Sequence, residues 1–158
     1  MNSRRDRSWK IAAVMSAVTS VLVLTACTSL QPETPAPEMD KGAVTAAIEE
    51  LSGVVGEEVG AYGTGRPDDF GLRVTVTVDE AGYEKVGEVV TGTVTTVAAS
   101  AGGYSSYDFE VVAPDPEGSG DAVVLTLSRY RDVIDLPVGS YLGSTLTLTS
   151  EELRQLSR

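Results

Sequence analysis

Three stretches of the chain alternate between apolar and polar residues, and this pattern restricts the possible folds more than any other feature of the sequence. In residues 71–79 the two alternating sets are Val74, Val76 and Val78 against Arg73, Thr75 and Thr77. Residues 107–111 and 123–127 alternate similarly. Successive side chains of a β-strand point to opposite faces, so each stretch predicts a strand with one face in a core and the other in solvent. Further strands are expected around residues 58–62 and 145–149.

Two other stretches place apolar residues three and four positions apart, which is the spacing of one helix face. The first follows Asp40, a helix-capping residue type, and carries Val44, Ala47, Ile48, Leu51 and Val55. The second follows Asp79 and carries Tyr83, Val86, Val90, Val94 and Val97. Residues 91–97 (TGTVTTV) are β-branched and contain glycine, but we expect a helix there because about 20 residues would make an unusually long strand. Thr149 and Glu152 have the spacing of a capping box and predict a short closing helix.

The order helix, strand, loop, strand occurs twice along the chain. Such an order typically folds into strand hairpins with the helices packed on one side. We therefore predict an α+β fold for a single domain over residues 41–158. Its expected core is an antiparallel sheet of about five strands with two helices on one face, built from a helix–strand–strand unit that occurs twice.

The first 26 residues have the layout of a secretory signal peptide. Residues 1–10 carry four basic residues and one acidic residue, and residues 11–24 carry no charge. Because a membrane span needs about 20 apolar residues, this run is short for a transmembrane helix. A basic start followed by a short apolar region predicts export. A signal anchor that stays in the bilayer is the alternative.

The end of this segment, Leu24-Thr25-Ala26-Cys27, resembles the lipobox of bacterial lipoproteins. The resemblance implies cleavage between Ala26 and Cys27, a diacylglycerol on the Cys27 thiol, and acylation of the new amino terminus by a fatty acid such as palmitate. Cys27 is also the only cysteine, so it has no partner for an internal disulfide. An incidental core cysteine is the alternative. We expect Cys27 to be the lipidation site and to hold the protein on the exported side of a cell membrane.

Residues 27–40 predict a tether between the lipid and the domain, because Pro32, Pro35 and Pro37 favour an extended chain. An ordered arm that lies on the domain is the alternative. Removal of residues 1–26 takes away four of 12 basic and one of 23 acidic residues, which leaves a formal charge of −14. This charge predicts a soluble monomer and argues against nucleic acid as a partner, since phosphates are bound by clustered basic residues.

Little in the remaining sequence indicates catalysis. There is no histidine, which excludes imidazole bases and Ser–His or Cys–His pairs. Neither Lys41 nor Lys85 lies in a Ser-x-x-Lys motif, and no glycine-rich phosphate loop occurs. The acidic stretch 113–121 departs from the ligand spacing of a calcium loop, and the acidic pair after Pro67 is typical of a turn. We expect no catalytic, cofactor-binding or metal-binding residue.

The tyrosines allow two interpretations. A recognition patch is possible because tyrosine is favoured at interfaces, whereas packing in the core is the more common use. The residues concerned are Tyr104, Tyr107, Tyr130 and Tyr141.

Together these features favour a membrane-anchored lipoprotein of the bacterial cell envelope whose domain binds or docks onto a partner without chemistry. Two alternatives stay open. One is a small envelope hydrolase that uses a carboxylate pair, and the other is a carrier of small apolar molecules held between sheet and helices.

Overall fold

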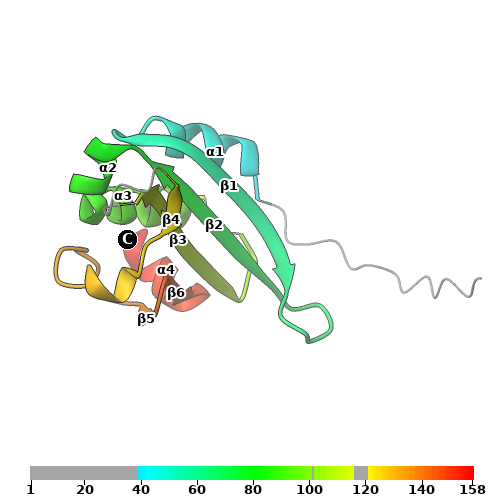
Figure 1. Cartoon of the computed structure of the whole chain (residues 1–158). Coiled ribbons are helices and arrows are strands. Elements are labelled where there is room, and N and C mark those ends of the chain that lie inside the picture. The colour runs from blue at the N-terminus through cyan, green and yellow to red at the C-terminus, as the bar shows by residue number, and fades with distance from the viewer. Residues whose placement is uncertain (1–38, 101, 116–120) are drawn as a thin grey trace, which may run out of the picture. The chain divides into compact units, whose positions relative to one another are not determined.

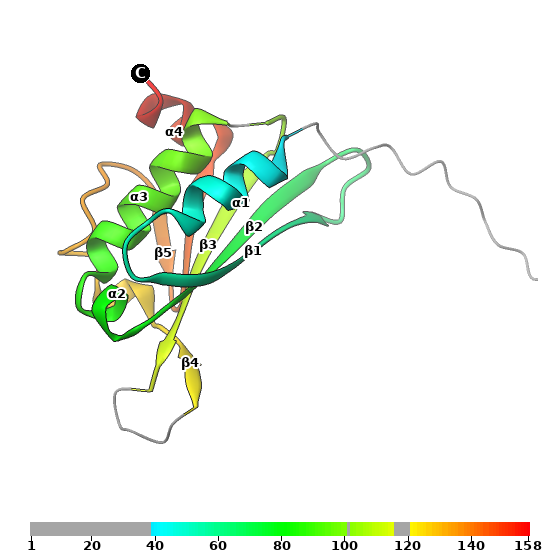
Figure 2. The same cartoon turned by 90° about the horizontal axis from the view of Figure 1, so that it is seen from above.

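The computed structural model describes residues 39–100, 102–115 and 121–158. Over these residues helices lie against one face of a β-sheet (Figures 1 and 2), which confirms the predicted α+β class. The helices are α1 (Lys41–Glu49), α2 (Glu80–Glu84), α3 (Val86–Ala99) and α4 (Ser150–Leu156), with a 3-10 turn η1 (Leu127–Arg129). The strands are β1 (Val54–Gly63), β2 (Phe70–Val78), β3 (Ser106–Pro114), β4 (Ala122–Val124), β5 (Ser140–Leu142) and β6 (Thr145–Thr149).

The expected capping residues begin three of the helices. The Asp40 side chain accepts a hydrogen bond from the backbone N–H of Ala43 at 3.0 Å, and Asp79 accepts one from Gly82 at 2.8 Å. Thr149 and Glu152 form a complete capping box at the start of α4. Each side-chain oxygen satisfies a backbone donor that has no partner within its helix.

The helix expected over residues 91–97 is also confirmed, since α3 continues to Ala99. Val94 and Val97 on this helix have no exposed surface. Burial of a valine stabilises the fold by about 1.5–3 kcal/mol, whereas a β-branched residue weakens a helix by less than about 1 kcal/mol. Packing against the sheet therefore outweighs the poor helix composition.

The strand order is β1-β2-β3-β6-β5, and β4 pairs with the end of β3 that β6 leaves uncovered. β1 and β2 form an antiparallel hairpin, whereas β2 and β3 are parallel. β3 is the central strand, because β2 follows one edge of it and β6 and β4 share the other.

Three details of the predicted sheet are wrong. Over the described residues the sheet is not wholly antiparallel, it has six strands rather than about five, and there are four α-helices rather than the two on one face and the short closing helix that were expected. The parallel pair follows from residues 79–105, where α2 and α3 carry the chain back to the starting end of β2 before β3 begins (Figure 2). Parallel neighbours require such a crossover connection. β5 has three residues, too few to show an alternating pattern.

The core lies between the helices and the facing side of the sheet. The strands contribute the alternate residues that the sequence pattern selects, and α3 contributes its valine stripe. The buried residues include Leu72, Val74, Val76 and Val78 of β2, Tyr107, Phe109 and Val111 of β3, Leu146 and Leu148 of β6, and Val86, Val90, Val94 and Val97 of α3. Val55 was expected on the first helix face but belongs to β1 and is 63% exposed, because α1 already ends at Glu49.

We predict that Gly87→Ala destabilises the domain. A Cβ atom at Gly87 would lie 2.1 Å from the carbonyl oxygen of Val133, which is backbone and not a rotatable side chain. Alanine normally stabilises a helix by about 1 kcal/mol over glycine, but overpacking costs about 1–3 kcal/mol. The clash should outweigh the gain, and denaturant unfolding measures the difference. Gly63→Ala is the control, because nothing lies within 4 Å of its Cβ position; equal stability of the two variants would contradict the prediction.

Candidate functional site

The face of the sheet opposite the helices is polar, and we call its central part the polar face. Strand pairing arranges its residues in three rows that cross the strands. The first row is Glu58, Thr75 and Glu110; the second is Gly60, Arg73, Asp108 and Thr147; the third is Tyr62, Gly71, Ser106 and Thr149.

Tyr62 reaches from the edge strand β1 across β2 to β3. Its ring lies over Gly71, where a Cβ atom would come within 2.3 Å of the ring carbon Cζ. The Tyr62 hydroxyl donates a hydrogen bond of 2.5 Å to Oδ2 of Asp108 and lies 3.2 Å from Oγ of Ser106. Gly71 is therefore required by the ring above it, since any larger residue would displace Tyr62.

Asp108 is a nearly buried carboxylate in the central strand, with 9% of its surface exposed. Besides Tyr62, the Thr147 hydroxyl donates to its Oδ1 at 2.7 Å. A carboxylate removed from water is costly unless donors surround it, and these hydroxyls supply them. Burial and then the hydrogen bond to Asp108 raise the pKa of the Tyr62 phenol, so it remains a donor.

Arg73 lies on the same face with its guanidinium group 5.3 Å from the centre of the Tyr62 ring. It is exposed, and it forms no hydrogen bond or ion pair with any other described residue. Stacking on an aromatic ring restrains a guanidinium without occupying its N–H donors. The Arg73 donors are therefore positioned and available.

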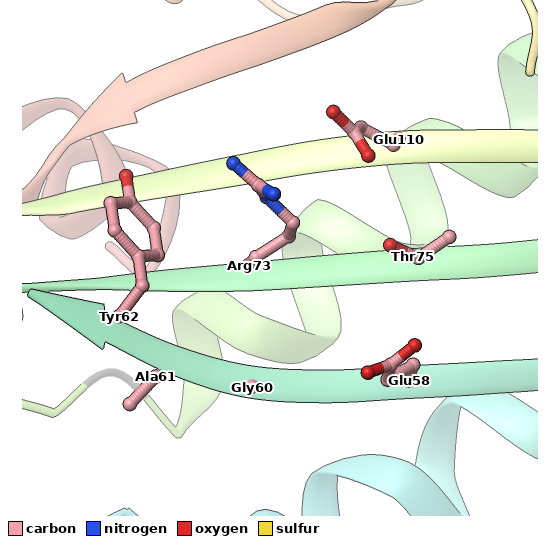
Figure 3. A pocket seen from close by; sticks show the side chains of 7 residues that line it. All are labelled: Glu58, Gly60, Ala61, Tyr62, Arg73, Thr75 and Glu110. Carbon is pink, nitrogen blue, oxygen red and sulfur yellow. The ribbon is translucent and has the colours of Figure 1, made fainter.

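A hollow of about 330 Å³ opens beside Arg73. Figure 3 shows Arg73 between Tyr62 and the row in which Glu58 and Glu110 stand on either side of Thr75. Gly60, the β1 neighbour of Arg73, supplies no side chain, and a Cβ atom there would meet nothing within 4 Å. The missing side chain keeps the hollow open.

This arrangement offers one cation, two carboxylates and a hydroxyl to a bound molecule. The Glu110 carboxylate already accepts a hydrogen bond of 2.9 Å from the Thr145 hydroxyl, which restrains it. Over the described part of the chain, no group of three or more acidic or cysteine residues is arranged to hold a metal ion. The chemistry that the site offers directly is hydrogen bonding and charge recognition.

The tyrosines considered as a recognition patch do not come together. Tyr104 and Tyr107 are 1% and 0% exposed, and their rings pack edge to face at 5.9 Å, which confirms the core interpretation for this pair. Tyr130 instead packs against Tyr83 at 6.4 Å, and Tyr141 is half-buried on β5.

The acidic stretches have local roles where the structure describes them. Asp69 accepts a hydrogen bond of 2.6 Å from the Thr64 hydroxyl within the β1–β2 turn. Hydrogen bonds from Ser105 and Thr64 lower the pKa of the Asp69 carboxyl. In the second stretch, the backbone N–H of Asp115 donates to the carbonyl of Asp121 at 2.9 Å, which closes the β3–β4 connection.

Three expectations concern residues outside the described part of the chain. They are the signal peptide over residues 1–26, the lipidation site Cys27, and the tether as far as residue 38. Glu117 of the second acidic stretch lies outside it as well.

Sequence reasoning did not identify Tyr62, Arg73 and Asp108 as a site. The alternating pattern did place Arg73 and Asp108 on the solvent side of their strands. What it lacked was the parallel pairing of β2 with β3, which makes these two residues neighbours. The one sequence feature that pointed to this site was Gly71, because a glycine within a strand often marks a position where another group approaches the backbone closely.

The chain was compared with protein-family models, curated proteins and solved structures, and nothing matched it. No family is therefore assigned to the chain.

We predict that Tyr62→Phe lowers the unfolding free energy at pH 7 by about 1–2 kcal/mol, because Asp108 loses a donor and keeps Thr147. A tyrosine with a raised pKa in the folded state stabilises the fold below its unfolded pKa of about 10, and this stabilisation is lost as the pH rises through the folded value. Wild-type stability should therefore fall above pH ~10, and less steeply in Tyr62→Phe.

The control is Thr147→Val, which removes the other donor to Asp108 but no titrating group. It should lose stability at pH 7 and keep the wild-type alkaline slope. Part of the slope should persist in all variants, because burial or hydrogen bonding also raises the pKa of Tyr104, Tyr107, Tyr130 and Tyr141. Equal slopes for Tyr62→Phe and wild type in urea unfolding between pH 9 and pH ~12 would contradict this assignment.

Proposed function

We propose that this protein is a lipid-anchored lipoprotein of the bacterial cell envelope whose domain binds a ligand on the polar face without catalysing a reaction. The observation that carries the proposal is Arg73, restrained on the Tyr62 ring and unpaired beside an open hollow. Polar groups held in place before a ligand arrives are typical of binding sites, because less side-chain freedom is lost on binding.

The anchoring part of the proposal rests on the lipobox resemblance at Cys27 and on the charge of the remaining chain. A net charge of −14 for residues 27–158 opposes adsorption to anionic headgroups, so acyl chains would have to provide the membrane affinity. Each buried CH₂ contributes about 0.8 kcal/mol, and two or three chains anchor a protein firmly. An extended tether of about 3.1 Å per residue would hold the domain away from the bilayer.

Among the described residues, no helix combines the length and apolar character needed to cross a membrane.

A hydrolase remains a second candidate because the hollow brings two carboxylates to one place. Glu58 and Glu110 both line it, one from each neighbour of β2. Carboxylate pairs serve glycoside hydrolysis when one of them protonates the leaving group. Glu110 is held by Thr145 and Glu58 is exposed, which supports a binding role over that of an acid–base pair. Turnover of a glycoside, abolished by Glu58→Gln or Glu110→Gln, would decide for the hydrolase.

A carrier of apolar molecules receives less support. The space between sheet and helices is occupied by the buried side chains of the core, and the hollow on the polar face is lined by charged and hydroxyl-bearing residues.

We predict that the full chain expressed in a bacterium fractionates with membranes and that Cys27→Ser moves it to the soluble fraction. The physical reason is the loss of the thiol that would carry the acyl chains. Intact mass of the wild-type protein should show removal of 26 residues and added fatty acyl groups. Ser29→Ala is the matched control and should remain in the membrane. Recovery of Cys27→Ser in the membrane pellet at the wild-type level would refute the anchor.

A further inference from the structure

We propose that the hollow on the polar face binds a small organic acid that carries one carboxylate together with N–H or O–H donor groups, such as a sugar acid or a dipeptide. This inference rests on the proposed function, because it names the ligand class of the same site. It follows from the charges that line the hollow and from its size.

Arg73 selects the carboxylate. Its guanidinium has no hydrogen-bond or ion-pair partner among the described residues, and a planar fork of N–H donors matches the two oxygens of a carboxylate. The Tyr62 ring beneath it is held in turn by the hydrogen bond to Asp108, so the cation–π contact favours an Arg73 orientation over that ring. The N–H donors of Arg73 can therefore bind a ligand carboxylate beside the Tyr62 ring.

Glu58 and Glu110 select the donor groups. Both lie one row away from Arg73, and each presents carboxylate oxygens that can accept hydrogen bonds. A hydroxyl or ammonium group of the ligand would satisfy them, and the Thr75 hydroxyl between them can both donate and accept. The site therefore requires an anionic group at the Arg73 end and donors at the other.

The same two glutamates disfavour phosphate and sulfate. A doubly charged oxyanion at Arg73 would share the hollow with one cation and two carboxylates, and like charges repel. Sulfate would also bring no donor for Glu58 or Glu110, and hydrogen phosphate would bring a single O–H for the two carboxylates. A monocarboxylate with donors balances the charge of Arg73 and leaves the glutamates hydrogen-bonded.

The hollow has room for a small ligand. A volume of about 330 Å³ lies at the lower end of the range of small-molecule sites, about 300–1,000 Å³. A single sugar ring or two amino-acid residues fit this space. At about 0.3 kcal/mol per non-hydrogen atom, a ligand of some 13 atoms has a dissociation constant on the order of 1 mM.

Calorimetric titration of the full chain, purified from membranes in detergent, tests the assignment with five probes. Galacturonate and alanyl-alanine carry both the carboxylate and the donors, and they distinguish a sugar acid from a peptide source. Acetate lacks the donors, galactose lacks the carboxylate, and inorganic phosphate has the wrong anion. We expect one of the first two to bind with a dissociation constant near 1 mM and the other three to bind at least tenfold more weakly.

Two variants test whether Arg73 and the open space at Gly60 are needed for ligand binding. Arg73→Gln should weaken the bound probe at least tenfold. Gly60→Leu should do the same by filling the hollow, and it should fold because its Cβ position is open. The control is Arg66→Gln, which removes an exposed arginine in the β1–β2 turn, away from the hollow, and should change affinity less than twofold.

The proposal is overturned if phosphate or acetate binds as tightly as galacturonate and alanyl-alanine, if Arg73→Gln binds like wild type, or if neither of these two probes binds at 20-fold its expected dissociation constant. If neither probe binds but the protein still fractionates with membranes, the proposed ligand class is wrong and the proposed membrane anchor stands. Hydrolysis of the amide bond of alanyl-alanine, detected as free alanine, would instead refute the non-catalytic function.

Discussion

The parallel pairing of β2 with β3 is the constraint on which the rest of the structure depends. The two strands bury alternate side chains, including Val74 and Phe109, against the valine stripe of α3. Each such side chain contributes about 1.5–3 kcal/mol when it leaves water, and the central strands contribute several of them. The pairing requires the crossover through α2 and α3, so the helices that cover the core also fix the strand direction.

The same pairing creates the polar face. A shift of one residue between neighbouring strands would exchange the two faces of one strand, so the register that buries Val74 also exposes Arg73. With β3 in that register, Arg73 stands beside Asp108, and Tyr62 can reach the Asp108 carboxylate across Gly71. Core packing on one side therefore holds the polar network on the other, although the two share no side chain.

The polar network illustrates how a charged group is tolerated in a central strand. The Asp108 carboxylate has little contact with water. Hydrogen bonds from the hydroxyls of Tyr62 on β1 and Thr147 on β6 replace those that water would have donated. The hydrogen bond from Tyr62 to Asp108 links the edge strand β1 to the central strand β3, across β2. Arg73, the only cation in the three rows, rests on that contact through the Tyr62 ring. The stability of the edge strand and the geometry of the candidate site are coupled for this reason.

The sequence by itself determined which residues form most helices and strands, and which side of each strand is apolar. Capping by Asp40 and Asp79 and the alternation of residues 71–79 are local properties, so a single chain segment carries them. Tertiary structure decided the strand order, the parallel direction of β3, and the exposure of Val55. It alone brought Tyr62, Arg73 and Asp108 together, because contacts between strands depend on which strands pair, and no local pattern records that choice.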